Sequence, residues 1–110
     1  MIQETLHKIE KSIQSSKNIT EKKRNELNTL LIHLKKEIQD LSESKKDDAK
    51  SIVGFAELAT HEALRNTQKK ELLDLAQHGL DTSVQEFEIT HPDLTSIVKT
   101  LIRTLSNLGI

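Results

Sequence analysis

The fold of this chain is decided by residues 27–41, which read LNTLLIHLKKEIQDL. Apolar side chains recur here at alternating intervals of four and three residues, which is the spacing of one face of an α-helix. The residues on this heptad-like seam are Leu27, Leu31, Leu34, Ile38 and Leu41. Thr20 is a suitable N-cap, so we predict a helix from Thr20 to about Ser44, about 36 Å long at the usual rise per residue. A compact chain of 110 residues has a radius of gyration of only about 13 Å, so this helix is expected to run the full length of the molecule or beyond it.

Helical spacing also marks the segments on either side of the seam. The N-terminal stripe pairs with the long helix to predict a coiled-coil-like hairpin over residues 1–44; it consists of Ile2, Leu6, Ile9 and Ile13. Residues 45–88 predict two central helices, with Asp47 and Asp48 suited to capping the first. Their apolar stripes are Ile52, Phe55, Ala56, Ala59 and Ala63, then Leu72, Leu73, Ala76, Leu80, Val84 and Phe87. Gly79 lies inside the second stripe and marks either a close helix crossing or a break.

The last helix is predicted over residues 92–110. Pro92 suits the first helical position, where its missing N–H leaves no hydrogen bond unmade. His91 is then the non-helical cap, and its ring can accept a backbone N–H at the start of the helix. Gly109 is expected to end the helix in the left-handed conformation.

Composition agrees with an all-α protein. Of the 38 hydrophobic residues, 27 are Ile or Leu, and the chain has one Pro and three Gly. Strand-like alternation is nearly absent. We therefore predict about five amphipathic helices that form one helical bundle, in a single domain over residues 1–110.

The C-terminal part of the chain resembles a known family. Residues 87–94 read FEITHPDL and residues 105–110 read LSNLGI. This arrangement is similar to the bacterial domain-of-unknown-function family 4404, whose members end in Phe-Glu-x-x-His-Pro-x-Leu, a helix and a terminal Leu/Met-Gly-Ile. The resemblance implies a helical bacterial protein, and it implies no activity.

The sequence offers little that catalysis or metal binding needs. The chain has no Cys and five histidines, His7, His33, His61, His78 and His91. Glu57 and His61 make a geometric half-site, but Arg65 stands where a zinc-protease helix has its second His. Phosphate-binding loops and nucleophile elbows are absent too. We therefore expect no catalytic residue, no cofactor, no metal site and no enzymatic activity.

A basic stretch at residues 17–36 suggests one alternative function. Its main side chains are Lys22, Lys23, Arg24, Lys35 and Lys36. Such a patch could contact the phosphates of a nucleic acid without reading its bases. A net charge of -1 and the lack of a recognition motif favour a solvated helix face instead.

The apolar pattern favours self-association. Runs of apolar residues are far shorter than the roughly 20 residues of a membrane span, and no targeting signal is present, so we expect a cytoplasmic protein. Because the predicted long helix is longer than a compact monomer accommodates, we expect a homodimer formed through the seam, from Leu27 to Leu41. The predicted function is a self-associating interaction or scaffold module, with an unidentified protein as a further possible partner.

Overall fold

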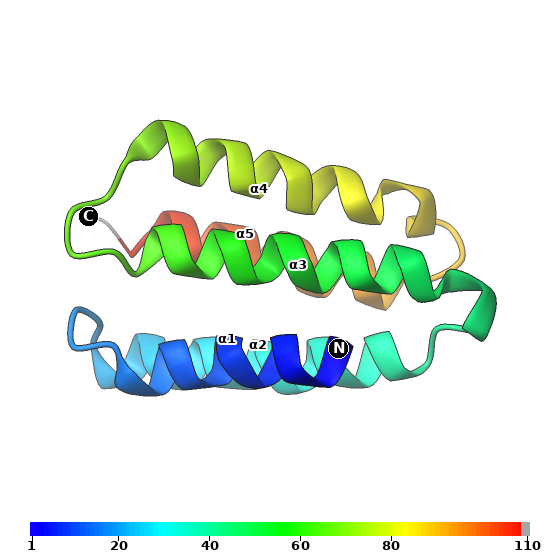
Figure 1. Ribbon diagram of the computed structural model, residues 1–110, viewed down its shortest axis with the longest axis horizontal. Coiled ribbons are helices and arrows are strands. Elements are labelled where there is room, and N and C mark those ends of the chain that lie inside the picture. The colour runs from blue at the N-terminus through cyan, green and yellow to red at the C-terminus, as the bar shows by residue number, and fades with distance from the viewer. Residues whose placement is uncertain (109–110) are drawn as a thin grey trace.

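The computed structural model describes residues 1–108, which form five α-helices in up-and-down order (Figure 1). The helices are α1 (Ile2–Ser15), α2 (Glu21–Gln39), α3 (Lys46–Ala63), α4 (Lys70–Val84) and α5 (Pro92–Ser106). Short 3-10 turns, η1 (Glu43–Lys45) and η2 (Gln85–Phe87), precede α3 and follow α4. The predicted all-α fold class and helical bundle are confirmed for these residues.

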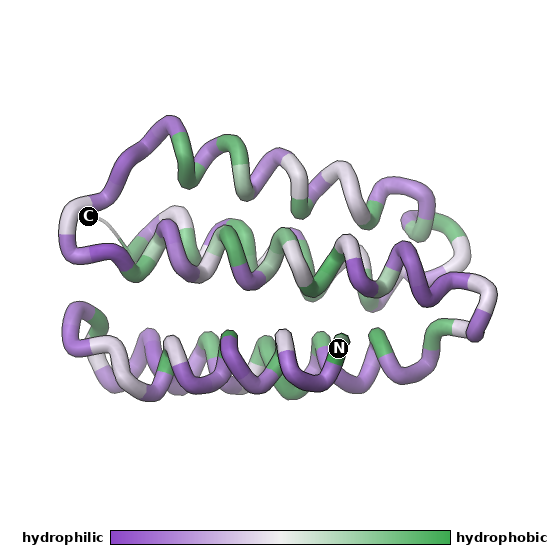
Figure 2. The backbone as a smooth tube through the Cα atoms, in the orientation of Figure 1, coloured by the Kyte–Doolittle hydropathy of each residue, from purple (hydrophilic) through white to green (hydrophobic). Residues whose placement is uncertain are grey.

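The helices are arranged in three layers. The α1–α2 hairpin forms one outer layer, α3 and α5 form the middle layer, and α4 covers the other side (Figure 1). The middle layer is therefore packed on both sides. Figure 2 shows the hydrophobic segments of the hairpin turned toward this middle layer, as the apolar stripes require.

One continuous hydrophobic core joins all five helices. Its largest fully buried side chains include Phe87, Leu27, Leu34 and Leu80. All five alanines are also buried; they are Ala49, Ala56, Ala59, Ala63 and Ala76. Four of them lie on α3, which packs against α1, α4 and α5. Small side chains on α3 allow these three neighbours to approach closely.

The long helix is shorter than its sequence pattern predicts. It begins after the expected cap, where the hydroxyl oxygen of Thr20 accepts a hydrogen bond from the N–H of Lys23 at 3.2 Å. It ends at Gln39, so Leu41 lies in the connection to η1. Nineteen residues span only about 28 Å, which fits within the 38 Å length of the molecule. The expectation that this helix extends beyond a compact monomer is therefore wrong.

Two predicted caps differ from the structure. Asp47 and Asp48 lie in the first turn of α3, and the cap position is held by Lys45 without a side-chain hydrogen bond. The two carboxylates therefore act on the helix dipole and are not caps. His91 does occupy the cap position before Pro92, but its ring accepts no backbone N–H.

The His91 ring is used in other contacts. Its Nδ1 lies 3.0 Å from the hydroxyl of Thr90, and the His91 and Phe87 rings form a T-shaped pair with a centroid distance of 5.4 Å. The backbone explains the entry into α5, because Pro92 sits at the first helical position as predicted. The predicted helix stop at Gly109 lies outside the described residues.

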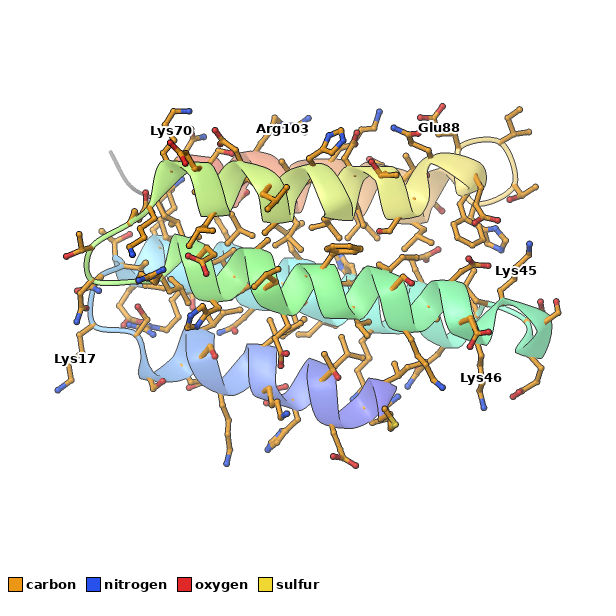
Figure 3. The ribbon with its side chains drawn as sticks, turned by 45° about the horizontal axis from the view of Figure 1, so that its top comes forward. Lys17, Lys45, Lys46, Lys70, Glu88 and Arg103 are labelled. Carbon is orange, nitrogen blue, oxygen red and sulfur yellow. The ribbon has the colours of Figure 1, made fainter. Side chains whose placement is uncertain are left out.

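Polar contacts hold both ends of the bundle. At one end the side chains of Asn18 and Asn66 share a hydrogen bond of 2.7 Å, which joins the α1–α2 loop to the α3–α4 loop. At the other end the ammonium of Lys45 lies 3.4 Å from a Glu86 carboxylate oxygen and 5.9 Å from the centre of the Phe87 ring. Figure 3 shows Lys45 at this end of the molecule.

Gly79 marks a close crossing and not a helix break. It lies inside the continuous helix α4, opposite Phe55 of α3. A Cβ atom placed at Gly79 would lie 2.4 Å from Cε1 of the Phe55 ring, which is closer than two non-bonded carbon atoms can approach. Glycine is therefore needed at this position for the Phe55 ring to lie against the α4 backbone.

Replacing Gly79 by Ala tests this contact. Alanine favours a helix over glycine by about 1 kcal/mol, so we expect Gly79→Ala to raise the free energy of unfolding by that amount in a Phe55→Ala background. With Phe55 present, the displaced ring is expected to cancel or reverse the gain. Urea denaturation of the four variants of this double-mutant cycle gives the coupling directly.

Gly54→Ala is the matched control, because a Cβ at that exposed position of α3 meets nothing within 4 Å. It should give the helix-propensity gain with or without Phe55. If Gly79→Ala changes the free energy of unfolding equally in both backgrounds, the helix crossing does not require glycine at residue 79.

Candidate interaction surfaces

The seam predicted to form a dimer is buried within one chain. Leu27 and Leu34 are fully buried, Leu31 and Ile38 are nearly so, and Leu41 is partly buried against the same core. α2 packs on α1 and α5 of its own chain. The seam is therefore not an exposed interface, and the assignment of self-association to these five residues is wrong: the extra layers of the bundle cover them.

The predicted basic patch is divided between structural and exposed side chains. The Arg24 guanidinium donates hydrogen bonds to the carbonyl oxygens of Ile13, of Gln14 at 3.0 Å and of Ser16 at 2.8 Å. These carbonyls end α1 and have no partner within the helix. The antiparallel hairpin brings the start of α2 to this point, and a cation there also complements the dipole of α1.

The four lysines of the patch differ in the same way. The ammonium of Lys23 lies 3.6 Å from a carboxylate oxygen of Glu26. The other three lysines are exposed; they are Lys22, Lys35 and Lys36. Because Arg24 is occupied and Lys23 is paired, the five residues do not form one surface available to a phosphate backbone.

Removing the Arg24 guanidinium should destabilise the hairpin. Arg24→Ala leaves several carbonyls of α1 without a partner, and we expect a loss of about 1–3 kcal/mol in the free energy of unfolding. Arg24→Lys should recover only part of this loss, because a single ammonium lacks the planar fork that reaches three acceptors. Urea denaturation followed by circular dichroism measures both.

Lys22→Ala, two residues away on an exposed position, is the control and should change stability by less than about 0.5 kcal/mol. If Arg24→Ala and Lys22→Ala have the same effect, the capping role of Arg24 is refuted.

Histidines and carboxylates do not gather at one place in the described chain. Residues 1–108 contain no group of three or more His, Asp or Glu side chains placed to hold a metal ion. His61 lies 4.0 Å from a Glu62 carboxylate oxygen, and Glu62 is itself paired with Arg65 at 3.0 Å. Glu62 is buried, so its pairing with Arg65 keeps an otherwise isolated carboxylate neutralised in the interior.

A second surface was not anticipated from the sequence. Four large apolar side chains on α3 and α4 are exposed, with these fractions of their surface accessible: Phe55 38%, Leu58 45%, Leu72 41% and Leu75 67%. We call this set the α3–α4 face. The two helices pack side by side, and Figure 3 shows them in front.

The register of the two helices places these side chains together. Phe55 lies opposite Gly79, and the helices run antiparallel. One turn farther along α3, Leu58 is therefore level with Leu75 of α4, and Leu72 follows one turn beyond. The face is thus continuous over about two turns of each helix. Contiguous apolar patches of this kind mark interaction sites more often than scattered single residues do.

In the sequence, the α3–α4 face corresponds to apolar residues beyond those that one core-facing stripe needs. The apolar stripes predict that Phe55 and Leu72 are core residues, but both are exposed. Leu58 and Leu75 fall outside the stripes, which makes both helices apolar over more than the width that one core needs. An excess of apolar width on two consecutive helices is the feature that could have identified the surface.

No helix among the described residues has both the length and the apolarity required to span a bilayer. The fold and surfaces of residues 1–108 define a class of protein: a small up-and-down bundle of helices with an exposed apolar face on α3 and α4.

Comparison with known proteins gives the family. The family model for a domain of unknown function (DUF4404) matches residues 31–110, and the chain belongs to this family. The match begins within α2 and includes the central helices, so it reaches well beyond the C-terminal residues that carried the resemblance. No curated protein and no solved structure matches the chain.

Proposed function

We propose that this protein is a non-enzymatic interaction module of the cytoplasm that associates with itself through the α3–α4 face. The observation that carries the proposal is the exposure of four large apolar side chains on adjacent turns of two packed helices. Covering them would remove apolar surface from water, which is the main driving force for association.

A second copy of the chain is a suitable occupant of this face. Two identical surfaces related by a two-fold axis bury each other, and such isologous contacts are the commonest way in which soluble proteins associate. The centre of the face is apolar, as the centre of a homodimer interface is. The two helices α3 and α4 together carry seven carboxylates and three lysines, and this excess of negative charge disfavours both nucleic acid and anionic lipid as partners.

The mass of the protein in solution tests the proposal. We expect a dimer by light scattering at micromolar concentration, and Leu75→Glu should convert it to a monomer. A charge placed in the centre of an apolar interface is desolvated without a partner, so we expect the dissociation constant to rise by at least about 100-fold.

Ile32→Glu is the matched control, because Ile32 on α2 has the same exposed fraction as Leu75, 67%, but lies away from the α3–α4 face. This variant should remain dimeric, with a circular dichroism spectrum equal to that of the parent. A parent protein that is monomeric throughout this range, or a dimer that survives Leu75→Glu, would overturn the proposal.

A further inference from the structure

The chain contains two phenylalanines and no Tyr or Trp, and the structure gives the two rings opposite environments. Phe87 is buried in the core, with 1% of its surface accessible. Phe55 belongs to the α3–α4 face, with 38% of its surface accessible. Aromatic side chains are enriched in protein interfaces, because each of them buries a large apolar area. The position of the Phe55 ring therefore affects how a partner can approach this face.

Gly79 sets the height of this ring above α4. A Cβ atom at residue 79 would lie closer than 3.0 Å to three carbons of the Phe55 ring, which are Cδ1, Cε1 and Cζ. The ring thus occupies the space that the side chain of any other residue at this position would fill. A ring that is held in place before association loses little conformational freedom when a partner binds.

Glycine is an unfavourable residue for the helix itself. Residue 79 lies inside α4, where only proline is less favourable than glycine. Gly54 of α3 does not show the same constraint, because an added Cβ atom there meets nothing within 4 Å. Gly79 differs, because its missing side chain is what allows the low position of the Phe55 ring.

From these contacts we infer that Phe55 is an anchor residue of the contact with a second copy, and that Gly79 is the positioning residue that sets the height of the ring. The low ring leaves Leu58 and Leu75, one turn farther along their helices, as the most exposed side chains of the face. A methyl group at residue 79 would push the ring outward, so that a partner would meet the ring before it met these leucines. The inference rests on the proposed self-association and assigns the residues that shape its contact surface.

A double-mutant cycle on association tests the inference. We expect Phe55→Ala to raise the dissociation constant of the dimer about 10-fold or more, because an apolar anchor is lost. Gly79→Ala should raise it by a similar factor, since the displaced ring holds the two surfaces apart. In a Phe55→Ala background, Gly79→Ala should change the dissociation constant by less than about 2-fold, because no ring is left to displace. Sedimentation equilibrium of the four proteins measures these constants.

A crossing that serves only the fold predicts a different result. Gly79→Ala would then change the free energy of unfolding of the monomer and leave the dissociation constant unchanged. An unchanged dissociation constant in Phe55→Ala or in a folded Gly79→Ala variant overturns the inference. If Leu75→Glu dissociates the parent dimer in the same series, self-association stands and only the assignment to Phe55 and Gly79 fails. If the parent is a monomer, both fail.

NMR of the parent protein gives a second test that does not depend on the folding of any variant. Selective isotope labelling of phenylalanine yields signals from Phe55 and Phe87 alone, and Phe55→Ala identifies which is which. On dilution from dimer to monomer, the ring signals of Phe55 should shift with the same midpoint as the light scattering. Those of the buried Phe87 should stay in place, which makes this ring the internal control. Phe55 signals that do not change through the transition would refute the inference.

Discussion

The structure depends on the burial of the apolar seam of α2 inside its own chain. Leu27 and Leu34 are fully enclosed because α1 covers one flank of α2 and α5 covers another. A seam with this spacing can equally be buried by a second chain, as in a coiled coil. Here the remaining helices supply enough apolar surface to complete the core within the monomer. Any association between chains must therefore use a different surface.

The α3–α4 face lies on helices that pack closely against their neighbours. The four alanines of α3 let α1, α4 and α5 approach, and Gly79 lets the Phe55 ring lie on the backbone of α4. With small residues at the contacts, the larger Leu58, Leu72 and Leu75 are left on the outer side of the same two helices. The same choice of residues thus gives a tightly packed layer and an exposed apolar face.

Much of the fold could be predicted because helices depend on local spacing. The N-cap at Thr20, the start of α5 at Pro92 and the all-α class all follow from residues close together in the sequence. The role of Arg24 could not be predicted in this way. In the sequence Arg24 belongs to a basic stretch, and only the folded hairpin brings its guanidinium to the last carbonyl groups of α1. The predicted seam interface failed for a related reason: periodicity shows that a face is apolar, but it does not show which element covers it.

The sequence by itself determined that this chain forms amphipathic helices, where α2 and α5 begin, and which faces of the helices are apolar. These properties are set by the 3.6-residue repeat and by capping groups within a few positions of each terminus. Only the tertiary structure decided that α2 is internal, that Arg24 is a cap and that the α3–α4 face is exposed. Each of these depends on which helices become neighbours, and that is set by the combined fit of all five apolar stripes in three dimensions.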